Sequence, residues 1–223
     1  MSPPALTAVV FDIGGVLIDW NPRHLYRKIF NSNEEAMESF LSNVCTRAWH
    51  IHHDDGRTFA EGAAWLIELY PDKAELIGAW GKRFQEMIAG PIYGAVDILA
   101  ELNAHKTPLF ALTNFPKEAF PATRKRFAFF ELFQGIVVSG DEKISKPDPR
   151  LYRILMERYR IDPSNAVFID DSGPNVNTAC DLGFTGILFT SPTDLRQKLQ
   201  NLGLLQPVKL CRSNPDSFGH SIK

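Results

Sequence analysis

Short apolar runs that recur between helix-like segments constrain this chain more than any other feature. Four of these runs end directly in polar residues, and a fifth follows later: 8–11, 109–112, 136–139, 166–169 and 186–189. The helical patterns that separate them lie at 95–103, 117–127, 149–159 and 175–182. Strands that are buried on both faces read as continuous apolar runs, and their alternation with helices favours a parallel sheet. We therefore predict an α/β fold with a Rossmann-like, doubly wound parallel sheet.

The segment between the first and second runs has a different character. Its helical patterns lie at 22–30, 34–41, 58–70 and 73–87, and it contains no convincing strand. We interpret residues 20–91 as a helical cap domain inserted into an α/β hydrolase core formed by 1–19 and 92–210. The end of the chain is polar, contains Pro215 and lacks periodicity, so we predict a flexible tail over 211–223.

Charge and hydropathy exclude several classes of protein. The formal net charge of -2 gives no basic excess of the kind that nucleic-acid binders carry. No run approaches the roughly 20 apolar residues that cross a bilayer, and the N-terminus lacks a signal-peptide pattern. Three scattered cysteines do not form a disulfide framework. We expect a cytoplasmic protein, monomeric or homodimeric, without nucleic-acid or membrane partners.

Polar residues follow four of the apolar runs at the point where each predicted strand ends. They are Asp12, Thr113 with Asn114, Lys146, and Asp170 with Asp171. In an open parallel sheet, ligands bind beyond the carboxyl ends of the strands. These side chains are therefore expected to converge on one site, although each one taken singly also suits a turn or a helix cap.

The combination of these residue types suits phosphoryl transfer, in which positioning and charge stabilisation supply most of the catalysis. Asp12 precedes two glycines and is the candidate nucleophile for a covalent intermediate. Asp171, one oxygen of Asp12 and the carbonyl of Gly14 offer hard oxygen ligands for Mg²⁺. Thr113, Asn114 and Lys146 can bind phosphate oxygens.

The order and spacing of these motifs resemble the haloacid dehalogenase-like hydrolase superfamily, in its subfamily I with a helical cap. The matching motifs are Asp12 to Val16, Thr113-Asn114, Lys146-Pro147 and Asp170-Asp171. The resemblance covers nearly the whole chain. It implies an enzyme in which Asp12 is the nucleophile and Thr113 and Lys146 hold the transferred group. It also implies that Asp171 holds magnesium, with Asp170 as a partner that supports the ligands or contacts the metal through water.

One position departs from the pattern of the family's phosphatases. They commonly have a second Asp two residues after the nucleophile as general acid and base, and here that residue is Gly14. Losing such help costs on the order of 10²–10⁴ in rate, so the chain needs an easy leaving group, a water or a cap residue instead. Some bacterial sugar-phosphate phosphatases of the family resemble this variant. The resemblance therefore implies Mg-dependent hydrolysis of small phosphorylated substrates, similar to sugar phosphates, through an aspartyl-phosphate.

Two alternatives use the same pocket differently. A 2-haloacid dehalogenase needs the Asp nucleophile but neither a leaving-group acid nor a metal, which Gly14 permits. Those enzymes typically have a Ser-Ser-Asn type segment where this chain has Asp170-Asp171-Ser172, and two extra acids repel a carboxylate substrate. The acid pair therefore favours a phosphatase. The third hypothesis is a catalytically weak protein that only binds a phosphorylated metabolite. A measurement of turnover distinguishes such a protein from the two enzymes.

The segment Trp49-His50-Ile51-His52-His53-Asp54-Asp55 combines imidazoles with acids. Such a cluster suggests a metal site, but it also arises in a polar loop or helix start, and the family needs no metal there. Caps of this type close over an active site and exclude water. We therefore interpret the segment as an element for specificity or proton transfer, a possibility that Trp20, Asn21 and Arg47 share.

Overall fold

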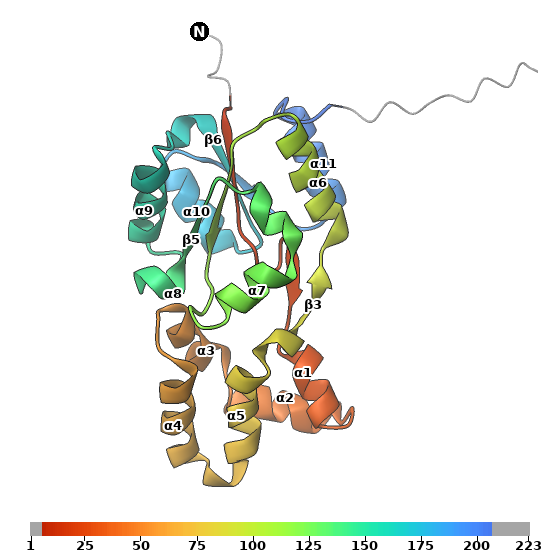
Figure 1. Ribbon diagram of the computed structural model, residues 1–223, viewed down its shortest axis with the longest axis vertical. Helices are drawn as coiled ribbons and strands as arrows, with labels where there is room; N and C mark the ends of the chain where they lie inside the picture. Colours follow the sequence, from red (N-terminus) through yellow and green to blue (C-terminus); the bar gives the residue numbers. More distant parts are fainter. Residues whose placement is uncertain (1–5, 207–223) are drawn as a thin grey trace, which may run out of the picture.

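A computed structural model describes residues 6–206 (Figure 1). The predicted tail over 211–223 lies outside the described residues. The strands are β1 (Ala8–Phe11), β2 (Ile18–Trp20), β3 (Ile88–Pro91), β4 (Leu109–Thr113), β5 (Gly135–Val138), β6 (Ala166–Asp170) and β7 (Thr185–Leu188). The α-helices are α1 (Arg23–Ile29), α2 (Glu34–Asn43), α3 (Arg47–Asp54), α4 (Phe59–Leu69), α5 (Ala74–Lys82), α6 (Tyr93–Ala104), α7 (Phe120–Arg126), α8 (Ser139–Glu142), α9 (Pro149–Tyr159), α10 (Gly173–Asp181) and α11 (Pro192–Asn201).

The central sheet confirms the predicted parallel α/β fold. Its strand order is β5-β4-β1-β6-β7, and every neighbouring pair is parallel. Alternate residues of β1 enter different cores: Val9 and Phe11 pack into one cluster, and Ala8 and Val10 into another. Helices α9 and α10 cover the second face, while α6 and α11 pack together on the other. The sheet is therefore doubly wound, with both faces buried.

The segment between β2 and β3 is mostly helical, and its helices α1 to α5 lie below the sheet in Figure 1. The expectation that residues 20–91 contain no strand is wrong. Strand β3 pairs antiparallel with β2 where the segment leaves and rejoins the core. Its sequence, Ile-Ala-Gly-Pro, is too short and mixed to show a period of two. The domain boundaries at 19/20 and 91/92 stay a prediction.

Two other elements of this segment differ from expectation. The pattern over 73–87 predicts one helix, but the structure has α5 followed by a 3₁₀ turn at Phe84–Met87. Residues 47–54 form α3, capped by the Thr46 side chain, which accepts a hydrogen bond from the Trp49 N–H at 3.1 Å. In residues 6–206 no helix has the length and apolar character that crossing a membrane requires.

Candidate active site

Asp12 lies directly after β1, at the carboxyl edge of the central sheet, and is 7% exposed. Its Oδ1 atom accepts the Ile13 N–H at 2.7 Å and lies 2.9 Å from the Lys146 Nζ atom. These contacts fix the rotation of the carboxyl group. Burial raises the pKa of Asp12 to about 7, although the Lys146 ammonium opposes this rise.

Lys146 joins two of the acids in the interior. Its side chain is fully buried, and Nζ donates to the Asp170 Oδ2 atom at 2.6 Å and to the Leu112 carbonyl at 2.8 Å. Burial lowers the pKa of Lys146, but the carboxylates of Asp12 and Asp170 together raise it above its ordinary value. The ammonium thus stays charged, between two strand ends that lie far apart in sequence.

Three carboxyl groups gather around this lysine. Single oxygens of Asp12, Asp170 and Asp171 all lie within 4.8 Å of one another, which is a spacing that one metal ion can bridge. Asp170 is fully buried, and its Oδ1 accepts the Ser172 N–H at 2.9 Å and the Asn175 amide at 3.0 Å. Because Lys146 occupies its other oxygen, Asp170 is committed to protein donors. Asp12 and Asp171 remain the better candidates for direct metal ligands.

The glycines after Asp12 make this arrangement possible. Gly15 has a φ of +76°, and a Cβ atom there would lie 2.3 Å from the Asp171 Oδ2 atom. Glycine is thus required at 15 both for the turn and for the approach of Asp171. A Cβ atom at Gly14, in contrast, would meet no atom within 4 Å. The side chain that family phosphatases have at this position would enter open space.

Thr113 and Asn114 follow β4 but differ in their contacts. Thr113 is fully buried, and its hydroxyl has no hydrogen-bond partner in the described part of the chain. A buried hydroxyl of this kind suits a ligand oxygen. The Asn114 amide instead donates to the Lys146 carbonyl at 2.9 Å and accepts the Lys146 N–H at 2.8 Å. This differs from the predicted phosphate contact, because the amide holds the lysine loop.

Helix α3 brings the histidine-containing segment to the same region. Its last residue, Asp54, is buried, and burial first, then the charges of Asp55 and Asp12, raise its pKa to about 8. His50 is also buried, and desolvation lowers its pKa to about 3. The His53 Nδ1 atom lies 3.1 Å from the Arg57 carbonyl, within hydrogen-bond distance. These histidines are therefore neutral packing residues at pH 7. The sequence pattern alone did not assign Asp54 to the site.

The raised pKa of Asp54 predicts how the Asp54→Asn variant changes stability with pH. An acid whose folded pKa exceeds its unfolded value of 3.8 stabilises the fold fully below that value. The contribution is lost as pH rises through the folded value of about 8. The unfolding free energy of the variant relative to wild type should therefore increase from pH 4 to pH 8 in urea titrations. A difference independent of pH would contradict a protonated, buried Asp54.

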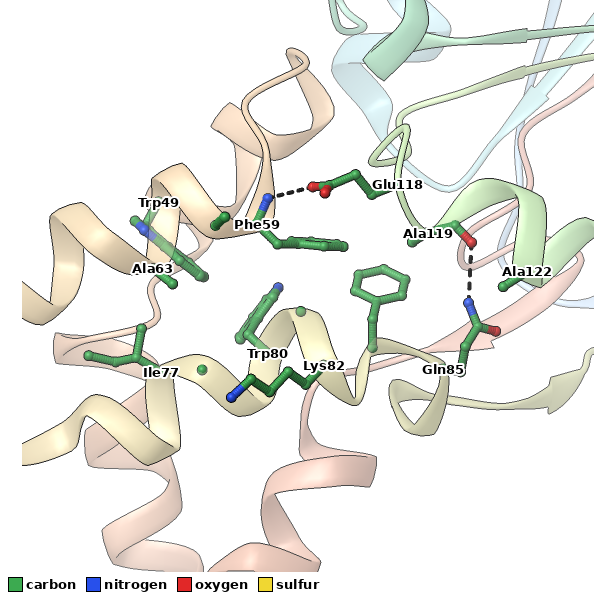
Figure 2. A pocket seen from close by; sticks show the side chains of 14 residues that line it. Trp49, Phe59, Ala63, Ile77, Trp80, Lys82, Gln85, Glu118, Ala119 and Ala122 are labelled. Atoms are coloured by element: carbon green, nitrogen blue, oxygen red, sulfur yellow. Dashed lines mark hydrogen bonds between the residues drawn. The ribbon is translucent and has the colours of Figure 1, made fainter.

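An apolar pocket of about 510 Å³ lies between the inserted helices and the core (Figure 2). Trp49, Phe59 and Trp80 line it from the helical segment, and Ala119 and Ala122 from the core side. Two hydrogen bonds between residues of the lining join the two sides. The Phe59 N–H donates to Glu118 at 2.5 Å, and the Gln85 amide donates to the Ala119 carbonyl at 3.2 Å. The lining residues do not include the acids of the catalytic edge.

A parallel α/β core with an inserted helical segment, and with acids and a lysine at its strand ends, defines a class of α/β hydrolases. The family model of haloacid dehalogenase-like hydrolases matches residues 6–183. The chain belongs to this family and is a hydrolase. The superfamily predicted from the four motifs is thereby confirmed.

Individual relatives are distant but extend over most of the chain. A sesquiterpene phosphatase of Aspergillus oryzae is 23% identical over 87% of this chain and 95% of its own length. A phosphorylated carbohydrates phosphatase of Thermotoga maritima is 22% identical over 82% and 84%. A haloacid dehalogenase family enzyme of Bacteroides thetaiotaomicron, solved as a magnesium complex, has a TM-score of 0.64 and 21% identity over 84% of this chain and 95% of that chain. This structural likeness shows the shared fold.

Proposed function

We propose that this hydrolase cleaves small phosphate monoesters, similar to sugar phosphates, with Mg²⁺ and through an aspartyl-phosphate on Asp12. The observation that carries the proposal is the buried contact between Asp12 and Lys146 inside a cluster of three carboxyl groups. A carboxylate held beside a buried ammonium can attack phosphorus while the ammonium stabilises the negative charge that develops. Two relatives that the chain matches over most of their length are phosphatases, which supports the same chemistry.

The residues of the chain divide the work between them. Asp12 attacks phosphorus, and Lys146 fixes the orientation of its carboxyl group. The unpartnered hydroxyl of Thr113 is available to a phosphate oxygen. Asp12 and Asp171, with the Gly14 carbonyl, would hold magnesium, and the acid cluster fits a divalent cation because neighbouring carboxylates repel one another. When bound, the cation would supply charge stabilisation for the phosphate oxygens.

The two alternatives receive less support from the same residues. Asp170 and Asp171 add negative charge that a 2-haloacid substrate does not need. A protein that only binds a phosphorylated metabolite has little use for a carboxylate held beside a buried lysine. Both alternatives differ from the proposed function in what the protein releases, which is halide in one case and no product in the other.

Comparative turnover tests the substrate class. Phosphate release should be measured from a panel of sugar phosphates, a prenyl phosphate and 4-nitrophenyl phosphate, each with Mg²⁺ and with a chelator. We expect the highest kcat/KM for a sugar phosphate, and loss of that activity in the chelator. A preference for the prenyl ester would contradict the sugar-like substrate class and would assign the apolar pocket to the substrate instead.

Asp171→Asn should raise the magnesium concentration required for half-maximal activity. The substitution removes one negative charge from the cluster and leaves a weaker neutral oxygen ligand. Loss of a group that only supports a metal ligand typically weakens metal affinity by about 10–100-fold, so loss of a charged direct ligand should weaken it by at least that factor. Titration of phosphate release against Mg²⁺ measures the shift. Asp181→Asn, at the end of α10, serves as the control, and an unchanged titration for Asp171→Asn would refute its role as a ligand.

A further inference from the structure

One buried carboxyl group beside the catalytic edge has no role in the steps described above. Asp54 is 6% exposed, and its Oδ1 atom has no hydrogen-bond partner in the described residues. The ring of His50 places its Nε2 atom 3.7 Å from this oxygen, which is beyond hydrogen-bond distance. A buried carboxyl group without a donor is costly when ionised. Such a group suits a protonated acid that faces a ligand.

Contacts at the end of α3 place Asp54 at the junction with the catalytic loops. The hydroxyl of Ser145, the residue before Lys146, donates to the Asp55 Oδ1 atom. The next residue, Gly56, approaches the core so closely that a Cβ atom there would lie 3.1 Å from the Gly140 carbonyl oxygen. Helix α3 meets α8 at this point, as Figure 1 shows. Asp54 is therefore held against the loop that carries Lys146.

The other side of α3 is fixed against the chain that follows Asp12. The His50 ring stacks on Trp20, at the end of β2, with centroids 4.9 Å apart. The helix thus contacts both the segment after the nucleophile and the lysine loop. At Gly14, no atom comes within 4 Å of an added Cβ, so the space where the family's usual acid would extend is open. Asp54 lies on the inserted helix α3, close enough to Asp12 and Lys146 for their charges to act on it.

We infer that Asp54 is the general acid and base of the reaction, in place of the acid that Gly14 lacks. This inference rests on the proposed phosphatase function. An Asp12 oxygen attacks phosphorus, the bond from phosphorus to the leaving oxygen breaks, and the Asp54 proton passes to that oxygen to release an alcohol. In the second half, water attacks phosphorus, its proton passes to the Asp54 carboxylate, and the bond from phosphorus to Asp12 breaks. Phosphate leaves, and both side chains return to their starting forms.

The surroundings of Asp54 keep its proton in place at neutral pH. Burial is the largest cause, and the charges of Asp55 and Asp12 add to it, while Lys146 and Arg47 oppose it. Asp54 is also the last residue of α3, where the negative end of the helix dipole disfavours a carboxylate. The pKa of Asp54 is thereby raised to about 8. The pKa of the neighbouring His50 is lowered to about 3, so its ring is a neutral imidazole at pH 7 and not the imidazolium that acts as a general acid.

Leaving groups of different basicity test this role. An alkoxide from a sugar phosphate needs a proton as it leaves, whereas 4-nitrophenolate is stable without one. In Asp54→Asn, kcat/KM for a sugar phosphate should therefore fall by about 10²–10⁴-fold. For 4-nitrophenyl phosphate, kcat/KM should fall by less than about tenfold. This parameter reports the first half of the reaction, in which 4-nitrophenolate leaves without a proton. Asp54→Glu should restore part of the sugar-phosphate activity, and Asp55→Asn, its neighbour, should show no dependence on the leaving group.

The outcomes separate this role from the proposed function. Equal losses on both esters, or no loss on either, in a folded Asp54→Asn protein would overturn the assignment of Asp54 while wild-type turnover upholds the phosphatase. If Asp54→Asn does not fold, the Asp54→Glu variant must show the same selective loss in smaller degree, and equal losses there overturn the assignment. Wild-type protein that releases phosphate from neither ester contradicts the proposed function and this role with it.

Discussion

Asp12→Asn should abolish phosphate release while leaving the fold intact. An amide oxygen is too weak a nucleophile to form the covalent intermediate, and removal of the nucleophile in a serine protease costs on the order of 10⁶ in rate. The substitution is nearly isosteric, and the carboxamide oxygen can still accept the Ile13 N–H. Thermal unfolding and turnover should be measured on the same preparation.

The matched control for this variant is Asp141→Asn. Asp141 is exposed, and among residues 6–206 its ion pair is with Lys117 at 3.2 Å, so its loss should leave turnover unchanged. Acid-quenched wild-type protein should carry one phosphoryl group on the peptide that contains Asp12, and the Asp12→Asn protein should carry none. Retained hydrolysis in the Asp12→Asn protein would contradict the assignment of Asp12 as the nucleophile.

Lys146→Met should affect both activity and stability. The substitution leaves Asp12 and Asp170 buried without the ammonium that lies 2.9 and 2.6 Å from them. Removing one partner of a buried ion pair typically costs about 3–5 kcal/mol of unfolding free energy. Urea denaturation at pH 7.5, without divalent cations, measures this loss, and turnover should fall to background.

The pH dependence of the Lys146→Met variant gives an internal check. Its deficit in unfolding free energy should shrink at pH 5, because protonation of the abandoned carboxyl groups removes their charge. Lys143→Met, at an exposed lysine of the same loop, should change stability by less than about 0.5 kcal/mol. If Lys146→Met is as stable as that control, the interior charge arrangement described above is wrong.

The sheet was predictable because its strands are buried on both faces and therefore appear as uninterrupted apolar runs. Strand β1 has the predicted bounds, and the other central strands differ by only one residue at either end. The ribbon of β2 and β3 was not predictable in the same way. Its three- and four-residue strands include Gly90 and Pro91, and their pairing joins residues about seventy positions apart. Such pairing depends on the tertiary fold and leaves no local periodicity.

The candidate site was predictable where strand ends place residues at one edge. Asp12, Lys146 and Asp170 form the contacts that convergence of the strands implies. The use of the Asn114 amide to hold the Lys146 loop was not predictable, since an amide at a strand end suits either role. The segment Trp49 to Asp55 was predicted to serve specificity or proton transfer, but the sequence did not single out Asp54 within it. Its burial and its position beside the lysine loop follow from the docking of α3, which the local sequence does not encode.

Product release in the presence and absence of magnesium tests the central claim most directly. Wild-type protein should be incubated with a sugar phosphate and, in parallel, with a short 2-haloacid, each with Mg²⁺ and with a chelator, while phosphate and halide are measured. Our account predicts magnesium-dependent release of phosphate and no release of halide. Metal-independent halide release without phosphate release would contradict it and would identify a dehalogenase.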